Sequence, residues 1–176
     1  MSDFEAALSK VPSHVSFGYS SVHICRPSEV EQRQLGYSIA ADGEPLWGDG
    51  DGDWRRSWLV IGDEGECGDP IFVDMAGAGY PVYTAWHGEG RWDPKPIAVS
   101  LYGLREALDA VAIAAQGREH PVALEQNPIK PAERNLVIES IRKHNPNIDL
   151  YFWKLMLGDD LSGESDIQDP CSRLKK

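Results

Sequence analysis

Four apolar runs of strand length dominate the middle of the chain. They are rich in β-branched and aromatic residues, as strands are, and they read SWLVIG (57–62), PIFVD (70–74), PVYTAW (81–86) and IAVS (97–100). Turn-like segments rich in glycine, aspartate and proline separate them. Because parallel strands need long crossover connections, these short links predict an antiparallel meander. An earlier stretch, VSFGYSSVHIC (15–25), predicts one or two further short strands.

Helical signals come before the central strands. Ser2 and Glu5 have the spacing of a capping box, which predicts a short helix at the N-terminus. The segment PSEVEQRQLG (27–36) repeats this spacing after a proline and ends in glycine, so we expect a second short helix there.

Longer helices are predicted after the strands. Apolar residues recur at helical spacing between Ser100, a candidate cap, and Gly117, which follows the last turn. Residues 132–145 predict another long helix, and the apolar segment 148–157 is expected to pack on the core. The fold class predicted from these patterns is α+β, with a twisted, largely antiparallel sheet and helices packed against it.

The domain organisation predicted is simple. Residues 1–157 are expected to form one domain, and the polar residues 158–176 a loosely ordered tail. We find no long apolar run and no secretory leader, so the sequence predicts a cytoplasmic protein outside the membrane. Cys25, Cys67 and Cys171 are far apart and form no C-x-x-C pair, so each is expected to be a free thiol.

Charge is strongly negative and unevenly distributed. The formal net charge is −11 and the sequence pI is about 4.8. Residues 42–93 hold 12 acidic residues and 3 arginines, a charge of −9, which leaves −2 for the rest of the chain. Such a surface repels nucleic acid and attracts a basic protein partner. The simpler interpretation is that acidity keeps the protein soluble.

The segment GDGDGDW (48–54) resembles the beginning of a calcium loop, because aspartates stand at alternate positions. An EF-hand loop also needs glycine after the third acid and glutamate at the twelfth position. Counting from Asp49, those positions hold Trp54 and Val60. The glycines are therefore interpreted as turn residues and the aspartates as solvated carboxylates, and no metal or other cofactor is predicted.

A second group of candidate residues consists of Asp69, Asp74, His87 and Asp93, which lie near predicted strand ends. Carboxylates with histidine can bind a metal or exchange protons. Their spacing matches no known catalytic motif, so turn positions are the preferred interpretation. Most of the six tryptophans are expected to be core residues or to clamp loops, with one or two exposed as interface contacts.

The strand block also carries a family resemblance. WLVIGDEGECGDPIFVD, followed by YPVYTAWHGEGRWDPKPIAVSLYGLREAL, resembles the central part of the SUKH superfamily, specifically its SMI/KNR-type branch. The resemblance covers roughly residues 54–110 and depends on the order and spacing of several short motifs. The matching residues are Trp58, Ile61, Gly62, Gly68, Asp69, Pro81, Val82, Tyr83, His87, Gly88, Ser100 and Leu104. The Pro-x-x-Tyr-x-x-Phe/Leu segment and Asn-Gly found near the start of many members are absent from residues 1–50.

The resemblance implies an α+β domain without a catalytic set. Bacterial members are thought to act mostly as immunity proteins that bind and neutralise polymorphic toxins, often nucleases. We therefore expect a non-enzymatic, protein-binding module with a basic toxin as partner. A scaffold or regulator with a non-toxin partner is the alternative, and a metal-dependent hydrolase using Asp69, Asp74 and His87 ranks third. The partner-binding face is predicted to include Asp49, Asp51, Asp53, Trp54, Asp63, Glu64 and Glu66.

Overall fold

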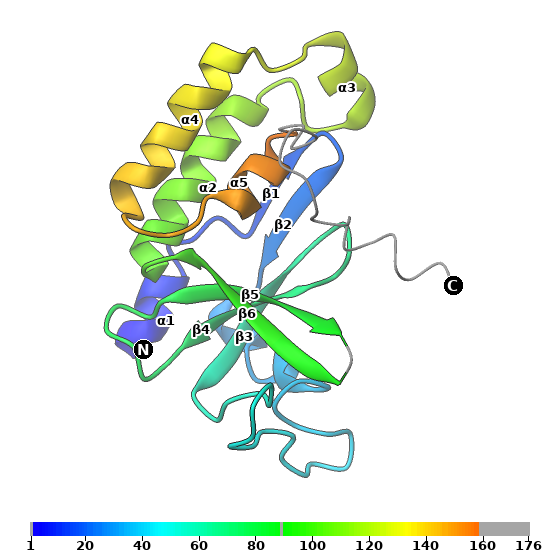
Figure 1. Cartoon of the computed structure of the whole chain (residues 1–176), viewed down its shortest axis with the longest axis vertical. Helices are drawn as coiled ribbons and strands as arrows, with labels where there is room; N and C mark the ends of the chain where they lie inside the picture. The colour runs from blue at the N-terminus through cyan, green and yellow to red at the C-terminus, as the bar shows by residue number, and fades with distance from the viewer. Residues whose placement is uncertain (1, 89, 159–176) are drawn as a thin grey trace.

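A single antiparallel sheet organises the molecule (Figure 1). The computed structural model describes residues 2–88 and 90–158, without the side chain of His87. Each strand pairs antiparallel with its neighbours in sequence, in the order β1-β2-β3-β4-β5-β6. The strands are β1 (His14–Phe17), β2 (Ser20–Ile24), β3 (Trp58–Glu64), β4 (Pro70–Asp74), β5 (Val82–Gly88) and β6 (Arg91–Ala98). The predicted meander is confirmed.

The last two strands are longer than predicted. The segment HGEGRWDPKP (87–96) was expected to be a turn, yet β5 continues to Gly88 and β6 begins at Arg91. Proline is compatible with an edge strand because its missing N–H can face away from the neighbouring strand. Pro94 and Pro96 lie in β6, which is the last strand of the sheet.

The described helices are α1 (Asp3–Leu8), α2 (Leu101–Ala115), α3 (Pro121–Gln126), α4 (Pro131–His144) and α5 (Tyr151–Met156). The capping box of α1 is present, with Glu5 N–H donating to Ser2 Oγ at 3.2 Å and Ser2 N–H donating to Glu5 Oε2 at 2.7 Å. The helix predicted at 27–36 is instead two 3-10 turns, η1 (Pro27–Glu29) and η2 (Gln32–Gln34). Helix α3 was not predicted.

Buried side chains form two clusters on opposite faces of the sheet. In β4, Ile71 and Val73 face the main core under the helices, whereas Phe72 faces a smaller cluster. The main core includes residues from Phe4 to Leu157, and Trp153 of α5 donates its indole N–H to the carbonyl of Ile97 at 2.8 Å. The predicted α+β architecture, with helices packed against the sheet, is thereby confirmed.

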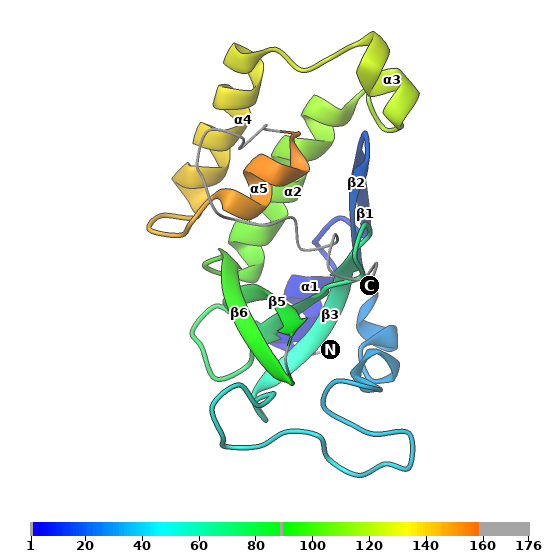
Figure 2. The same ribbon diagram turned by 45° about the vertical axis from the view of Figure 1, so that its right-hand side comes forward.

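Helices α3 and α4 and the segment between η2 and β3 lie at opposite ends of the molecule, whereas α1 lies beside the sheet between them (Figures 1 and 2). Helices α2 and α4 run side by side at one end, and residues 35–57 loop out at the other. None of the helices described is long and apolar enough to cross a bilayer. The predicted tail, apart from Gly158, lies outside the described residues.

Candidate functional site

The strongest candidate for a binding surface is the segment from Leu35 to Ser57, which we call the acidic loop. Short bridges give it internal structure, with Ile39 paired to Pro45 and Trp47 paired to Trp54. The amide of Gly48 donates to the carbonyl of Trp54 at 3.0 Å and closes the glycine and aspartate turn. These backbone hydrogen bonds and bridges therefore hold the loop in a defined conformation, from which its side chains project.

An aromatic cluster beneath the acidic loop holds it against the sheet. Trp54 lies at its centre and is 1% exposed. Its ring centroid lies 4.8 Å from that of Phe72, 5.1 Å from Trp92 and 5.3 Å from Trp58, and its indole N–H donates to the carbonyl of Trp58 at 3.2 Å. The expectation that Trp54 lies on the surface is wrong, because this large apolar side chain is buried beside the sheet.

The three aspartates of the acidic loop have different environments. Asp53 Oδ2 accepts from the amide of Gly50 at 2.7 Å and shapes the turn. Asp51 pairs with Arg91 of β6, with 3.0 Å between Oδ2 and the guanidinium nitrogen. Asp49 is exposed and makes no hydrogen bond or ion pair with the described residues. Asp49 is thus the member of this group most available to a partner.

The other predicted acids lie elsewhere. Strand β3 runs from Trp58, beside the acidic loop, to Glu64, and its six residue steps span ~20 Å. Asp63 pairs with Arg33 at 2.5 Å and lies 3.4 Å from His23 Nδ1. Glu64 accepts from the amides of Glu66 and Cys67 at 2.8 and 2.9 Å, which closes its own turn. The predicted face therefore consists of two acidic groups at opposite ends of β3.

Exposed apolar side chains accompany the carboxylates of the acidic loop. Leu35 is 54% exposed, Leu46 46% and Trp47 38%. The bridge between Leu35 and Ile39 and the bond from the Leu46 amide to the Ser38 carbonyl, 3.0 Å, bring these segments together. Sequence analysis did not single out Leu35, Leu46 or Trp47. The available signal was their position among glycines and acids, where no periodic pattern assigns them to the core.

The proposed metal-binding acids are not brought together. Asp69 and Asp74 lie at the two ends of β4, ~17 Å apart along the strand, and Asp93 pairs with Trp86 in the β5–β6 ladder. His87 belongs to β5, but its side chain is not among those described. No group of three histidine, cysteine, aspartate or glutamate side chains in the described part of the chain is arranged to bind a metal ion.

Burial, with the Glu64 carboxylate nearby, raises the pKa of Asp69 to about 6.

The cysteines differ from the prediction in one case. Cys25 is a buried free thiol, and desolvation raises its pKa to about 11. Cys67 is disulfide-bonded, so the expectation of a free thiol is wrong there. A disulfide depends on the distance between two sulfur atoms in the fold, which spacing in the sequence does not give. Cys171 lies outside the described residues.

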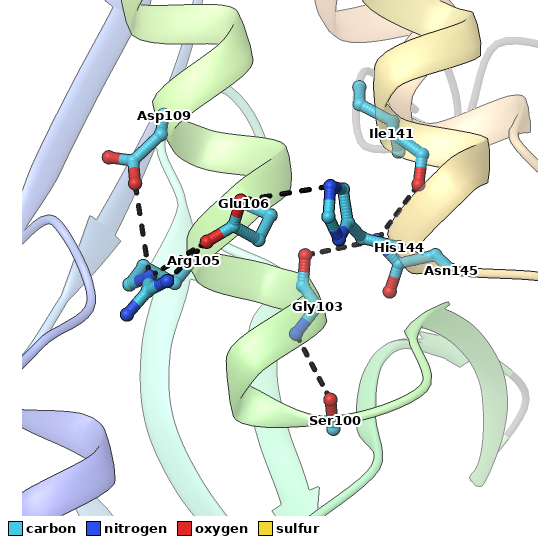
Figure 3. Close-up of polar contacts among 8 residues, drawn as sticks. All are labelled: Ser100, Gly103, Arg105, Glu106, Asp109, Ile141, His144 and Asn145. Atoms are coloured by element: carbon cyan, nitrogen blue, oxygen red, sulfur yellow. Dashed lines mark hydrogen bonds and ion pairs between the residues drawn. The ribbon is translucent and has the colours of Figure 1, made fainter.

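A polar cluster between α2 and α4 also escaped the sequence analysis (Figure 3). Glu106 Oε2 lies 3.7 Å from His144 Nε2, and Glu106 Oε1 forms an ion pair with Arg105, which also approaches Asp109 at 4.0 Å. Beneath this network Asn145 is fully buried against α2. The cluster joins α2 to α4, and in this geometry its role is to hold the two helices together. Gly103, a glycine inside a helix, was the sequence signal that α4 packs closely against α2 there.

No family model, curated protein or solved structure significantly matches this chain. The SUKH resemblance therefore stays a prediction, and the geometry of the acidic loop carries the functional argument.

Proposed function

We propose that this chain is a non-enzymatic, protein-binding module of the SUKH type that neutralises a basic toxin by covering its working surface. The observation that supports this proposal is the acidic loop, in which exposed Leu35, Leu46 and Trp47 lie among carboxylates. Toxins that act on nucleic acid have basic clefts, and an anionic surface with apolar contacts is complementary to such a cleft.

The two kinds of side chain have separate roles in this proposal. Exposed carboxylates that form no ion pair with the described residues, above all Glu44 and Asp49, attract the partner and raise the association rate. The apolar side chains lose water on contact and slow dissociation. Trp54 does not touch the partner; it holds the loop in place through the aromatic cluster.

The proposal is tested with the product of the adjacent gene. We expect that gene to encode a basic toxin domain, and co-expression of this chain to rescue cells that express the toxin. The triple variant Asp42→Asn, Glu44→Gln, Asp49→Asn should weaken the complex about tenfold at low salt and flatten its salt dependence. Binding is measured by titration calorimetry at several salt concentrations.

A matched control removes the same charge from the helices. Asp109→Asn, Glu125→Gln, Glu139→Gln alters exposed acids of α2, α3 and α4, and it should leave affinity nearly unchanged. Equal losses in the two triple variants would refute the acidic loop as the binding surface. Tight binding of a neighbouring product without rescue of cells would favour the scaffold or regulator.

A further inference from the structure

The acidic loop holds a cation against an exposed aromatic ring. The Arg56 guanidinium carbon lies 5.1 Å from the centroid of the Trp47 ring, within the range of a cation–π contact. Arg56 is exposed and, among the described residues, forms no hydrogen bond or ion pair, although five carboxylates belong to the same loop. The indole is therefore the contact that positions this guanidinium.

The position of Trp47 is set by the loop and not by Arg56. Its backbone pairs with Trp54, and the Gly48 amide donates to the Trp54 carbonyl at 3.0 Å. Trp54 itself lies in the buried aromatic cluster. The indole of Trp47 thus has a supported backbone on one side and a weakly held cation over its ring.

We propose that the ring of Trp47 is the recognition site for an arginine side chain of the basic partner, and that Arg56 occupies this site until the partner displaces it. The inference rests on the proposed function, since it names the chemistry by which the same loop recognises its partner. Exchange of one guanidinium for another keeps the cation–π contact. Arginine is favoured over lysine because a planar guanidinium stacks on an indole. Arg56 then acts as a specificity-determining residue that competes with weak cationic ligands.

The test uses fluorescently labelled nona-arginine and nona-lysine peptides as probes, with binding measured by anisotropy. Arg56→Gln frees the ring and should raise affinity for nona-arginine about two- to fivefold, the factor that an exposed cation–π contact represents. The gain for nona-lysine should be smaller. Thermal unfolding of each variant confirms that the fold is retained.

A double-mutant cycle separates the freed ring from the loss of one positive charge. In the Trp47→Leu background, Arg56→Gln changes the charge without exposing an indole, so the gain should fall toward onefold. An equal gain in both backgrounds, or no gain with Trp47 present, would overturn the inference. Its failure is distinct from failure of the proposed function, which is shown when the Asp42, Glu44 and Asp49 triple variant loses no more affinity for the basic partner than the helix triple variant does.

Discussion

The side chain of Asn145 fastens the end of α4 to the first turn of α2 by contacting Gly103 (Figure 3). Its Nδ2 donates to the Gly103 carbonyl at 3.0 Å and to the Ile141 carbonyl at 3.2 Å, and its Oδ1 accepts from the Val99 amide at 3.0 Å. The side chain is fully buried and satisfies backbone groups from three segments. A methyl group at position 103 would lie 2.3 Å from Asn145 Oδ1.

Substitution of Asn145 by alanine should destabilise the protein by about 2–4 kcal/mol, because it removes three hydrogen bonds of a fully buried side chain and takes the acceptor away from the Val99 amide. Gly103→Ala should also destabilise, by ~1–3 kcal/mol, although alanine ordinarily favours a helix over glycine. Urea unfolding followed by circular dichroism measures both changes. Asn135→Ala, at an exposed position of α4, is the control and should be nearly neutral. Equal stability of Asn145→Ala and Asn135→Ala would contradict this assignment.

A second connection joins α2, the segment after α3, and α4. The guanidinium of buried Arg118 donates to Glu133 Oε1 and Oε2 at 2.6 and 3.0 Å, to the Ala114 carbonyl at 2.7 Å and to the Asn127 carbonyl at 2.8 Å. The hydrogen bonds from Arg118 lower the pKa of Glu133. Helix α4 is thereby connected to α2 near both of its ends.

Glu133→Gln should lower stability at neutral pH and matter progressively less in acid. A carboxyl group whose folded pKa is depressed contributes stability above its unfolded pKa and loses it as the pH falls through the folded pKa. The free energies of unfolding of native protein and variant should therefore converge as the pH falls below 4.5, the ordinary pKa of a glutamate side chain, and through the lowered folded pKa. Glu139→Gln on the exposed face of α4 is the control. A difference that is constant over this range would show that the carboxylate charge of Glu133 is not involved.

Local patterns predicted the elements that local interactions determine. The capping box at Ser2 and Glu5 and the run PIFVD both correspond to the observed elements, because capping and alternation depend on neighbouring residues. The segment after His87 was missed because the prolines of β6 resemble turn residues in the sequence. Only the position of β6 at the sheet edge makes them compatible with a strand.

The candidate site was predictable in charge but not in contact surface. Alternating aspartates and glycines correctly indicated an exposed loop at residues 48–53. Whether Trp47 or Trp54 faces solvent depends on which one reaches the sheet cluster around Phe72, which is a tertiary contact. Likewise, the ion pair between Asp63 and Arg33 joins β3 to η2, and the spacing of these residues in the sequence does not indicate it.

Asp69 should make stability depend on pH in the direction opposite to Glu133. Its folded pKa is raised from 3.8 to about 6, so the folded state binds the proton more tightly than the unfolded state does. Stability is then highest when the group is protonated, and it falls as the pH rises from about 4 through 6. Asp69→Asn should be more stable than the native protein at pH 8, by ~1 kcal/mol after allowance for solvent screening.

That advantage of Asp69→Asn should vanish near pH 4, as measured by urea unfolding across the range. Asp49→Asn removes an equal charge from the exposed acidic loop and controls for net charge. A stabilisation of equal size at pH 4 and pH 8 would mean that it does not arise from ionisation of Asp69.

The free edge of the sheet at β6 offers few hydrogen-bond donors. Pro94 and Pro96 pair with Ala85 and Tyr83 of β5 and have no N–H. Trp92 lies two residues before Pro94, so its N–H points to the same side of the strand, away from β5. This amide donates to the Gly52 carbonyl of the acidic loop at 2.8 Å. Because alternate residues of an edge strand point their N–H groups away from the sheet, these three positions leave no free outward donor between residues 92 and 96.

Restoring the donors of β6 should make the protein associate with itself. The variant Pro94→Val, Pro96→Val gives the edge two outward N–H groups and residues that favour strands, which together form a template for another chain. We expect dimers or larger species in size-exclusion chromatography with light scattering, increasing with concentration. Pro128→Val, at an exposed position between α3 and α4, should remain in the same state as the native protein. If the double variant keeps the native mass at high concentration, the prolines do not protect this edge, and the closure of Trp92 onto Gly52 is sufficient.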